Sequence, residues 1–333
     1  MQHRHVNLKE LSNLLGLSQT TVSRALNGYP EVAETTRQRI VRAASAAGYK
    51  PSQHARLLAG GRANAIGLIW YPEPTQPDDG LKGGLLRSLV SAGSVYGLHF
   101  VLIIGGHDGG LQEARTLSLR GMIDAVLLLD PKSSPSPDDW PVPIACLGRR
   151  PVSGTKMTWI DIDHEHTAYA AATFLFQLGH RRVVIVDDRT DRMQFYLAGA
   201  RRALKQFNTR TEEGFAIDLE PVRRLWEMSI HERPTSFICT SLALAHEVAT
   251  SASENRINVG RDISIVAYDE KGEETGKCDQ PLFTVCRPNI DVVARRALEA
   301  VRSLIEPAAV HPINPLIRTE LVMGASTGAR AAV

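Results

Sequence analysis

Residues 6–26, VNLKELSNLLGLSQTTVSRAL, constrain the fold of this chain more than any other stretch, because two short helical patterns meet there at a glycine. The first pattern repeats leucine at i, i+3 and i+7, on one face of a helix that ends before Gly16. The second repeats apolar residues at i, i+3 and i+4, again on one face. The two sets are Leu8, Leu11 and Leu15, then Val22, Ala25 and Leu26. Each face needs a partner that buries it, so the stretch predicts a helix-turn-helix.

A third helical pattern spans about residues 34–47 and ends at Gly48. Its apolar positions are Ile40, Val41, Ala44 and Ala47. Ala33 precedes this helix, and because alanine has no side-chain acceptor we expect a weak amino-terminal cap. We therefore predict a helical head at residues 1–50, followed by a linker at residues 51–62. The linker has helical potential, but it is too short to fold alone and should order only against a partner.

The second helix of the head turns polar side chains outward. Glutamine can bond adenine at N6 and N7, and arginine can bond guanine at O6 and N7 in a bidentate manner. We therefore expect Gln19, Thr20 and Arg24 to read the major groove of double-stranded DNA. Candidates for phosphate contacts are Ser18, Thr21, Ser23 and Asn27. The alternative is a small surface bundle whose polar residues merely face solvent.

Charge supports the DNA interpretation. Residues 1–62 carry nine Lys or Arg against three Glu, a net charge of +6, whereas the whole chain carries only +2. A basic head on a mildly acidic body is typical of a phosphate-binding module attached to a ligand-binding or assembly domain. No membrane span or signal peptide is evident, so we expect a cytoplasmic protein that does not bind membranes. The four cysteines are widely spaced, which favours reduced and mostly buried thiols.

From Ala65 onward, apolar strands alternate with helical patterns, which predicts an α/β body with parallel sheets. Ligands of such sheets lie beyond the carboxyl ends of the strands. Residues that follow strands are Trp70, Tyr71, Arg149 and Asp269. Aromatic faces and charged groups there would suit a carbohydrate. The alternative is that Trp70 packs in the core and Arg149 pairs with a neighbouring carboxylate.

Catalytic and metal-binding patterns are absent from the sequence. HEH at residues 164–166 lacks metal-ligand spacing and is typical of a helix amino terminus, while GGHDGG at residues 105–110 departs from the dinucleotide fingerprint at His107. There is no G-x-S-x-G, Walker loop or paired nucleophile and base. We therefore expect no enzyme activity, no cofactor and no metal.

Several motifs together resemble the lactose-repressor and galactose-repressor family of transcriptional regulators. They are TVSRALNG at 21–28, ETTRQRI at 34–40, GYKP at 48–51, ARLLAGG at 55–61, LGHRRVVIV at 178–186 and GRDISIVAYDE at 260–270. The resemblance covers nearly the whole chain. It implies a body with the two-lobed architecture of periplasmic binding proteins, with lobe 1 at 63–162 and 291–320 and lobe 2 at 163–290 and 321–333. It also implies crossovers near Asp163, Ile290 and Glu320.

The resemblance also implies roles for particular residues. The family's hinge leucine inserts into the minor groove, which assigns that role to Leu58 within a helical stripe with Ala55 and Ala59. The family's effector-contacting aspartate corresponds to Asp269. Three departures stand out. Tyr196 replaces an arginine of the effector site, Ser241-Leu242 replaces Asn-Asp, and Ser52 replaces the usual Asn of the hinge. We include Tyr196 among the effector-binding candidates, in a pocket that is less hydrophilic or differently shaped.

Together these features predict a sequence-specific DNA-binding transcriptional regulator, a repressor that binds a pseudo-palindromic operator as a homodimer. Its effector would be a sugar or sugar derivative bound between the two lobes. Two other classes share the body: a bilobal sugar-binding protein without DNA-linked regulation, and an α/β enzyme. The basic helix-turn-helix head favours the regulator over both.

Overall fold

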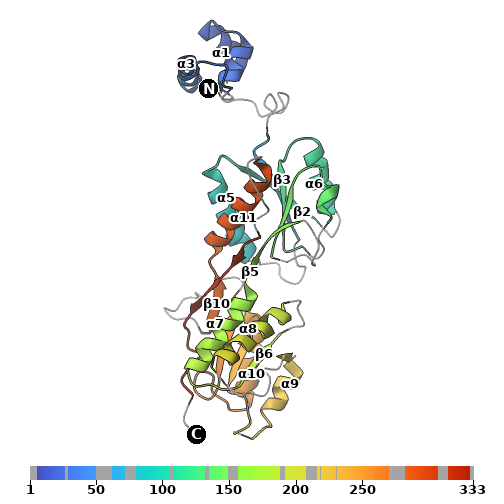
Figure 1. The fold of residues 1–333 in the computed structure, drawn as a ribbon, viewed down its shortest axis with the longest axis vertical. Helices are drawn as coiled ribbons and strands as arrows, with labels where there is room; N and C mark the ends of the chain where they lie inside the picture. The colour runs from blue at the N-terminus through green and yellow to red at the C-terminus, as the bar shows by residue number, and fades with distance from the viewer. Residues whose placement is uncertain are drawn as a thin grey trace.

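The computed structural model describes residues 6–26, 29–49, 62–71, 80–105, 109–131, 135–148, 157–187, 192–207, 216–217, 219–229, 231–269, 282–306 and 314–330. It contains a small helical head at the amino-terminal end and two α/β lobes that follow it (Figure 1). The predicted fold class, a helix-turn-helix head on a two-lobed α/β body with parallel sheets, is confirmed.

The head consists of α1 (Leu8–Leu15), α2 (Gln19–Leu26) and α3 (Glu34–Ala46). Gly16 ends α1 with a positive φ of 65°, a conformation that glycine adopts without steric cost. The small head core contains Leu11, Leu15, Val22, Ala25, Ile40 and Ala44. One expected core position is wrong: Val41 is 49% exposed, because the buried stripe of α3 is narrow and follows Ile40 and Ala44 alone.

Lobe 1 is built on a six-stranded sheet with the order β11-β5-β4-β3-β1-β2, in which all pairs are parallel. Its strands are β1 (Ala65–Trp70), β2 (His99–Ile104), β3 (Ala125–Leu129), β4 (Ile144–Leu147), β5 (Thr158–Ile162) and β11 (Leu316–Ile317). Helices α5 (Gly80–Ser94) and α11 (Ile290–Ile305) pack on one face and α6 (Gly109–Leu119) on the other, with a short 3-10 helix at Pro137–Asp139. Burial on both faces explains why β1 and β3 are continuously apolar.

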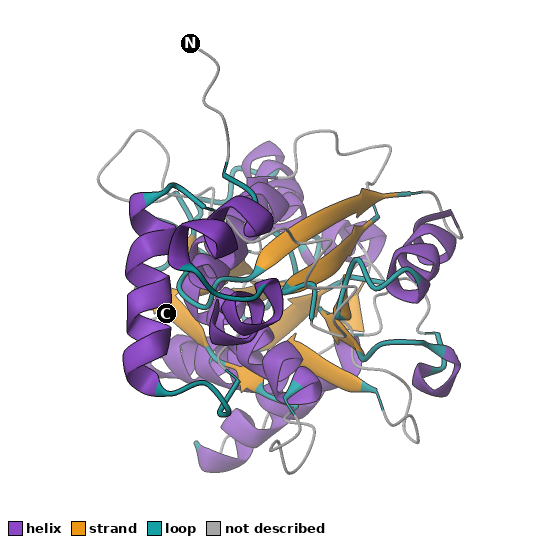
Figure 2. Ribbon diagram, turned by 90° about the horizontal axis from the view of Figure 1, so that it is seen from above, coloured by secondary structure: helices purple, strands orange, loops and turns teal. Residues whose placement is uncertain are grey.

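Lobe 2 repeats this design with a sheet of order β12-β10-β9-β8-β6-β7. Its strands are β6 (Val183–Val186), β7 (Ala216–Ile217), β8 (Ser236–Cys239), β9 (Ser264–Tyr268), β10 (Thr284–Pro288) and β12 (Thr319–Val322), and only β12 is antiparallel to its neighbour. Its helices are α7 (His164–Gln177), α8 (Met193–Gln206), α9 (Leu219–Leu225) and α10 (Leu242–Glu254). Viewed from above, helices surround the strands of the body (Figure 2).

The chain passes between the lobes three times. It leaves β5 for α7 through Asp163, β10 for α11 through Asn289, and β11 for β12 through Arg318. Each crossing therefore starts at the carboxyl end of a strand and needs a single residue. Since all other strands of the lobe 1 sheet run parallel to β5, and all of lobe 2 except β12 run parallel to β10, the carboxyl edges of both sheets meet at the lobe junction.

The last described residues are held on lobe 2 by hydrogen bonds, several of which involve the ring of His180. The ring Nδ1 lies 2.9 Å from Thr235 Oγ1, and Nε2 lies 2.9 Å from Ser264 Oγ and 3.3 Å from the Gly328 carbonyl oxygen. The Ser326 hydroxyl also accepts the backbone N–H of Thr284 at 2.9 Å. The imidazole is buried, and burial lowers the pKa of His180 to about 4, aided by the nearby cations Arg330 and Arg181.

Three of the cysteines, Cys146, Cys239 and Cys286, are buried, reduced thiols, as expected, whereas Cys278 lies outside the described residues. Burial raises the pKa of Cys146 and of Cys286 to about 12. Among the described helices, none is long and apolar enough to cross a membrane.

The buried, hydrogen-bonded ring of His180 predicts a pH dependence of the free energy of unfolding. Below pH 6.5 the unfolded chain takes up a proton that the folded chain excludes until about pH 4, so stability falls as the pH drops through this window. The loss should total about 3 kcal/mol. We expect urea unfolding of wild type to show this additional slope and His180→Gln to lack it. If the free energy of unfolding depends equally on pH in the two proteins, the assigned role of His180 is wrong.

Candidate functional site

Helix α2 presents the three predicted base-reading residues to solvent. Gln19, Thr20 and Arg24 are all exposed, while Val22 and Ala25 of the same helix are buried in the head core. The 3.6-residue period produces this separation, because positions 22 and 25 share one side of the helix. An exposed amide and an exposed guanidinium on one short helix can both reach the edges of bases.

Hydroxyl groups fix the start of α2. The Ser18 hydroxyl accepts the backbone N–H of Thr21 at 3.1 Å, and its oxygen lies 2.8 Å from Thr21 Oγ1. Ser18 therefore caps α2 at its amino terminus. Ser23 is half-buried, and Asn27 lies outside the described residues. Helix α1 has a capping box, in which Asn7 and Glu10 each accept the other's backbone N–H at 2.9 and 3.0 Å, a signal that the sequence reading missed.

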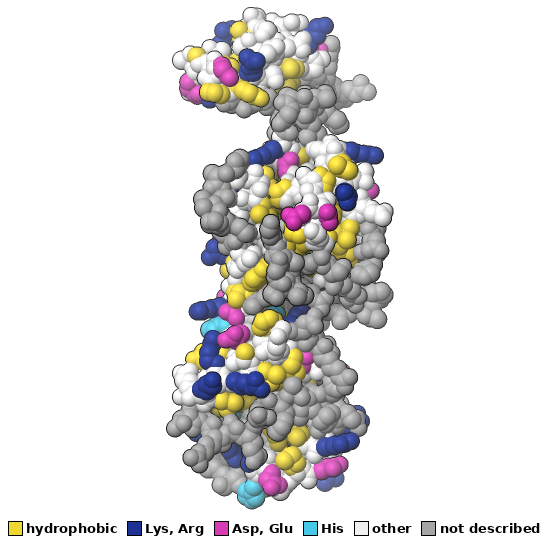
Figure 3. All heavy atoms as spheres, turned by 45° about the vertical axis from the view of Figure 1, so that its right-hand side comes forward, with side chains coloured by type: hydrophobic (Ala, Val, Ile, Leu, Met, Phe, Trp, Pro, Cys, Tyr) yellow, Lys and Arg dark blue, Asp and Glu magenta, His cyan; other side chains and the backbone are white. Residues whose placement is uncertain are grey.

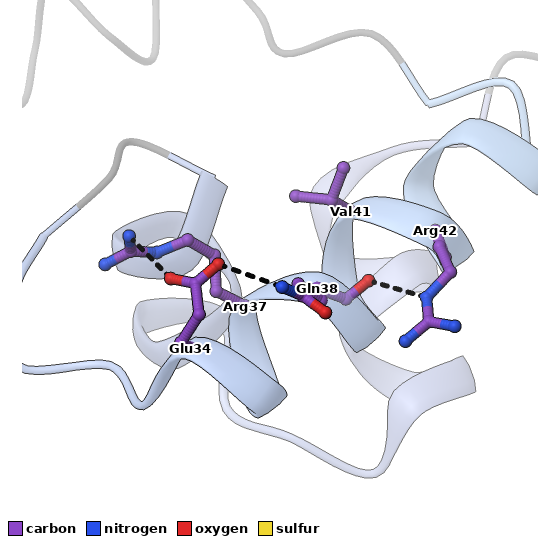
Figure 4. A pocket seen from close by; sticks show the side chains of 5 residues that line it. All are labelled: Glu34, Arg37, Gln38, Val41 and Arg42. Atoms are coloured by element: carbon purple, nitrogen blue, oxygen red, sulfur yellow. Dashed lines mark hydrogen bonds and ion pairs between the residues drawn. The ribbon is translucent and has the colours of Figure 1, made fainter.

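Helix α3 holds the other two helices in place. Arg39 donates to the Leu15 carbonyl at 3.2 Å, and Arg37 donates to the Tyr29 carbonyl at 2.8 Å. The expected weak cap is confirmed, because Ala33 makes no side-chain hydrogen bond to the helix. A groove on α3 is lined by Glu34, Arg37, Gln38, Val41 and Arg42 (Figure 4). None of the predicted DNA-contacting residues lines it.

The second candidate site is the junction where the two carboxyl edges meet. Trp70 ends β1 and Tyr71 follows it, and both are half-buried on the lobe 1 side. Asp269 follows β9 on the lobe 2 side and is fully buried, with its backbone N–H donating to the Cys286 carbonyl at 3.0 Å. Arg149 of lobe 1, like Ala55, Leu58 and Ala59 of the linker, lies outside the described residues.

Tyr196 lies in a buried cluster at this junction. Its ring stacks on His164 at a centroid distance of 5.8 Å, and Tyr268 meets the same imidazole edge-on at 5.4 Å. His164 Nε2 in turn lies 3.9 Å from Asp161 Oδ1 of lobe 1. The close approach of α7 and α8 depends on Gly199, where a Cβ would lie 2.1 Å from the Glu165 carbonyl oxygen.

His164 begins α7 and Asp163 caps it by accepting the His166 backbone N–H at 2.9 Å, so the predicted helix amino terminus at HEH is confirmed. The pKa of His166 is lowered, first by burial and then by the nearby cations Arg318 and Arg202. Within the described part of the chain, no group of His, Cys, Asp and Glu side chains could hold a metal ion.

Sequence reasoning missed two polar residues of the junction, Asp187 after β6 and Thr240 after β8. The Thr240 hydroxyl donates to Asp187 Oδ1 at 2.7 Å, and both residues are buried. Their position after apolar strands was the available signal, and it is the same signal that identified Asp269.

Comparisons with known proteins assign both parts of the chain. Residues 7–52 match the bacterial regulatory proteins of the lacI family, and residues 156–327 match the periplasmic binding protein-like domain. The HTH-type transcriptional regulator AglR of Rhizobium meliloti (strain 1021) is 30% identical, over 97% of this chain and 94% of its own length. The regulator RafR of Escherichia coli is 27% identical, over 93% of this chain and 95% of its own length.

Solved structures share the fold over nearly the whole chain. The lac repressor dimer bound to operator and the anti-inducer ONPF has a TM-score of 0.67 at 19% identity, over 98% of this chain and 100% of that one. The complex of the transcriptional regulator CelR with cellobiose has a TM-score of 0.63 at 20% identity, over 96% of this chain and 99% of that one.

The amino-terminal caps of α2 and α3 make a matched test. Ala33 has an extended backbone with φ −54° and ψ 140°, so a serine there could accept an N–H of α3. Ala33→Ser should stabilise the head by up to about 1 kcal/mol, and Ser18→Ala should destabilise it by about the same amount. In the full chain, the hydrogen-exchange rate of the Ile40 amide should fall by up to about fivefold in Ala33→Ser and rise by up to about fivefold in Ser18→Ala. Changes of the opposite sign would contradict this account of the caps.

Proposed function

Because the chain belongs to the LacI family of bacterial regulatory proteins, we propose that it is a repressor whose affinity for operator DNA is set by a small molecule at the lobe junction. Family membership makes the chain a DNA-binding transcriptional regulator and not an enzyme. The single observation that carries the proposal is the joining of an exposed reading helix to a two-lobed body in one chain.

On DNA, Gln19, Thr20 and Arg24 contact base edges in the major groove. Their exposure on α2, above a buried Val22, supports this assignment. The phosphate contacts come from Ser18, Thr21, Ser23 and Asn27. Ser18 and Thr21 fix each other by their hydroxyl groups, so any phosphate contact there is made from a fixed position.

The operator is pseudo-palindromic and is bound by a homodimer, whose linkers place Leu58 in the minor groove beside Ala55 and Ala59. An apolar surface of lobe 1 supports the dimer. Large apolar side chains are exposed on it, including Val95 and Tyr96 after α5, Leu102 and Ile104 on β2, and Leu119 and Met122 around the end of α6. Hydrophobic side chains are visible on the lobe 1 surface in Figure 3. Large exposed apolar side chains are typical of protein interfaces where they adjoin one another.

The effector binds between the lobes, at the carboxyl edges of the two sheets, and contacts Asp269, Trp70, Tyr71, Arg149 and Tyr196. It is a sugar or a sugar derivative. The CelR structure with cellobiose supports this class, as do the half-buried aromatic residues Trp70 and Tyr71 after β1 and the buried carboxylate of Asp269 after β9. Because it touches both lobes, the effector can favour one lobe arrangement over another.

The protein works in the cytoplasm. We place the head at 1–50, the linker at 51–62 and two lobes that exchange segments near residues 163, 290 and 320. A bilobal sugar-binding protein without DNA-linked regulation would have no use for three exposed base-reading side chains on a basic head.

Arg24→Ala tests the reading helix. The loss of a bidentate contact should cost about 1 to 3 kcal/mol at one base position of the operator and relax the preference for that base. Selection from a randomised DNA pool, with wild type and variant in parallel, measures both effects. Arg42→Ala is the matched control, because Arg42 is also exposed but lies on α3, where it donates to the Gln38 carbonyl.

The control should retain the full base preference of wild type. If Arg24→Ala weakens DNA binding equally on every sequence, Arg24 contacts a phosphate and not a base. Unchanged binding of the Arg24 variant would contradict the proposed orientation of α2.

A further inference from the structure

Asp187 and Thr240 stand beside Asp269 in one row at the carboxyl edge of the lobe 2 sheet. They follow β6, β8 and β9, which are neighbouring strands in the order β9-β8-β6. The ladder itself fixes the backbone of this row, because the N–H of Thr240 donates to the Val186 carbonyl at 3.0 Å. We name Asp187, Thr240 and Asp269 the acceptor row.

The acceptor row places buried polar side chains directly after apolar strands. Each of its residues follows an apolar strand residue, Val186, Cys239 or Tyr268, and each is at most 6% exposed. Burying a carboxylate costs free energy, and an apolar side chain at a strand end would avoid that cost. The change from apolar to polar occurs at the edge that faces lobe 1, where the proposed effector binds.

We infer that Asp187, held in place by Thr240, contacts the effector together with Asp269, and that the effector is a neutral or cationic polyhydroxyl compound. This inference rests on the proposed function and specifies the ligand class of the same site. Thr240 is a positioning residue: its hydroxyl donates to Asp187 Oδ1 at 2.7 Å and so fixes the direction of that carboxylate.

The spacing of the row supports this ligand class. With β8 between them, the ends of β6 and β9 lie about 10 Å apart, twice the usual strand separation. A sugar ring with a hydrogen bond at each end can bridge such a span. Carboxylates accept hydrogen bonds from hydroxyl or ammonium groups, whereas they repel phosphates and acid sugars. The two carboxylates of the acceptor row outnumber Arg149, the one cation among the proposed effector contacts, and Arg318 of the third crossing is exposed and adjoins β12, four strands from β6.

A ligand panel on the full chain tests the inference. The probes are cellobiose and glucosamine, representing neutral and cationic sugars, and glucose 6-phosphate and glucuronate, representing anionic ones. We expect a rise in Tm with at least one of the first two and none with the anionic pair. Asp187→Asn should weaken the binding of that ligand about tenfold or more, because a buried hydrogen bond to a charged group is lost.

Further variants separate positioning from structure. Thr240→Val should weaken binding severalfold and Thr240→Ser should restore it, because serine keeps the hydroxyl donor. Asp262→Asn is the matched control, since Asp262 precedes β9 at the opposite edge of the sheet, and it should bind ligand like wild type. Operator affinity without ligand should also stay at the wild-type value for Asp262→Asn.

Each contrary result has a distinct meaning. Stronger binding of the anionic sugars would overturn the ligand class but leave an effector site at the junction. Wild-type ligand affinity in both Asp187→Asn and Thr240→Val would overturn their roles and leave the proposed function standing. If no probe changes Tm while operator binding is intact, the inference and the proposed sugar effector both fail, and the DNA-binding head remains.

Discussion

The rest of the body depends on the geometry of the three chain crossings. Each leaves the carboxyl end of a strand and enters the other lobe within one residue, at Asp163, Asn289 or Arg318. With parallel strands behind them, such short crossings force the carboxyl edges of both sheets toward each other. Residues that are far apart in the chain, such as Tyr71 and Asp269, therefore come to border one junction.

The same crossings connect the junction to the head. Asn289 caps α11 by accepting the Val292 backbone N–H at 3.2 Å, so this helix begins at a crossing. It runs for 16 residues, about 24 Å, and ends at Ile305. There the Ile305 carbonyl accepts a hydrogen bond of 2.7 Å from Arg62, at the carboxyl end of the predicted linker. A rearrangement of the lobes can therefore be transmitted to the linker through the packed helix α11.

Local patterns were sufficient to predict the head and most of the strands. The apolar periodicity of each helix predicts the head core, with Leu11 and Leu15 from α1 and Val22 from α2. Continuous apolar runs predict β1 and β3. The roles of β5 and α11 could not be read in this way, because β5 pairs with β11 more than 150 residues later. Asp187 and Thr240 carry the same sequence signal as Asp269, a polar residue after an apolar strand, but only the order β9-β8-β6 shows that the three residues are neighbours. Periodicity also could not show that Tyr196 stacks on His164.

The central claim is that occupancy of the junction controls the affinity of the head for DNA. Its most direct test is operator affinity with and without the panel compound that raises Tm, for wild type and Asp269→Ala. Ligand should change the operator affinity of wild type, whereas the folded variant should bind operator with wild-type affinity in the absence of ligand and respond little to ligand. A wild-type protein that binds ligand but keeps one operator affinity, or a variant that responds like wild type, would contradict the account.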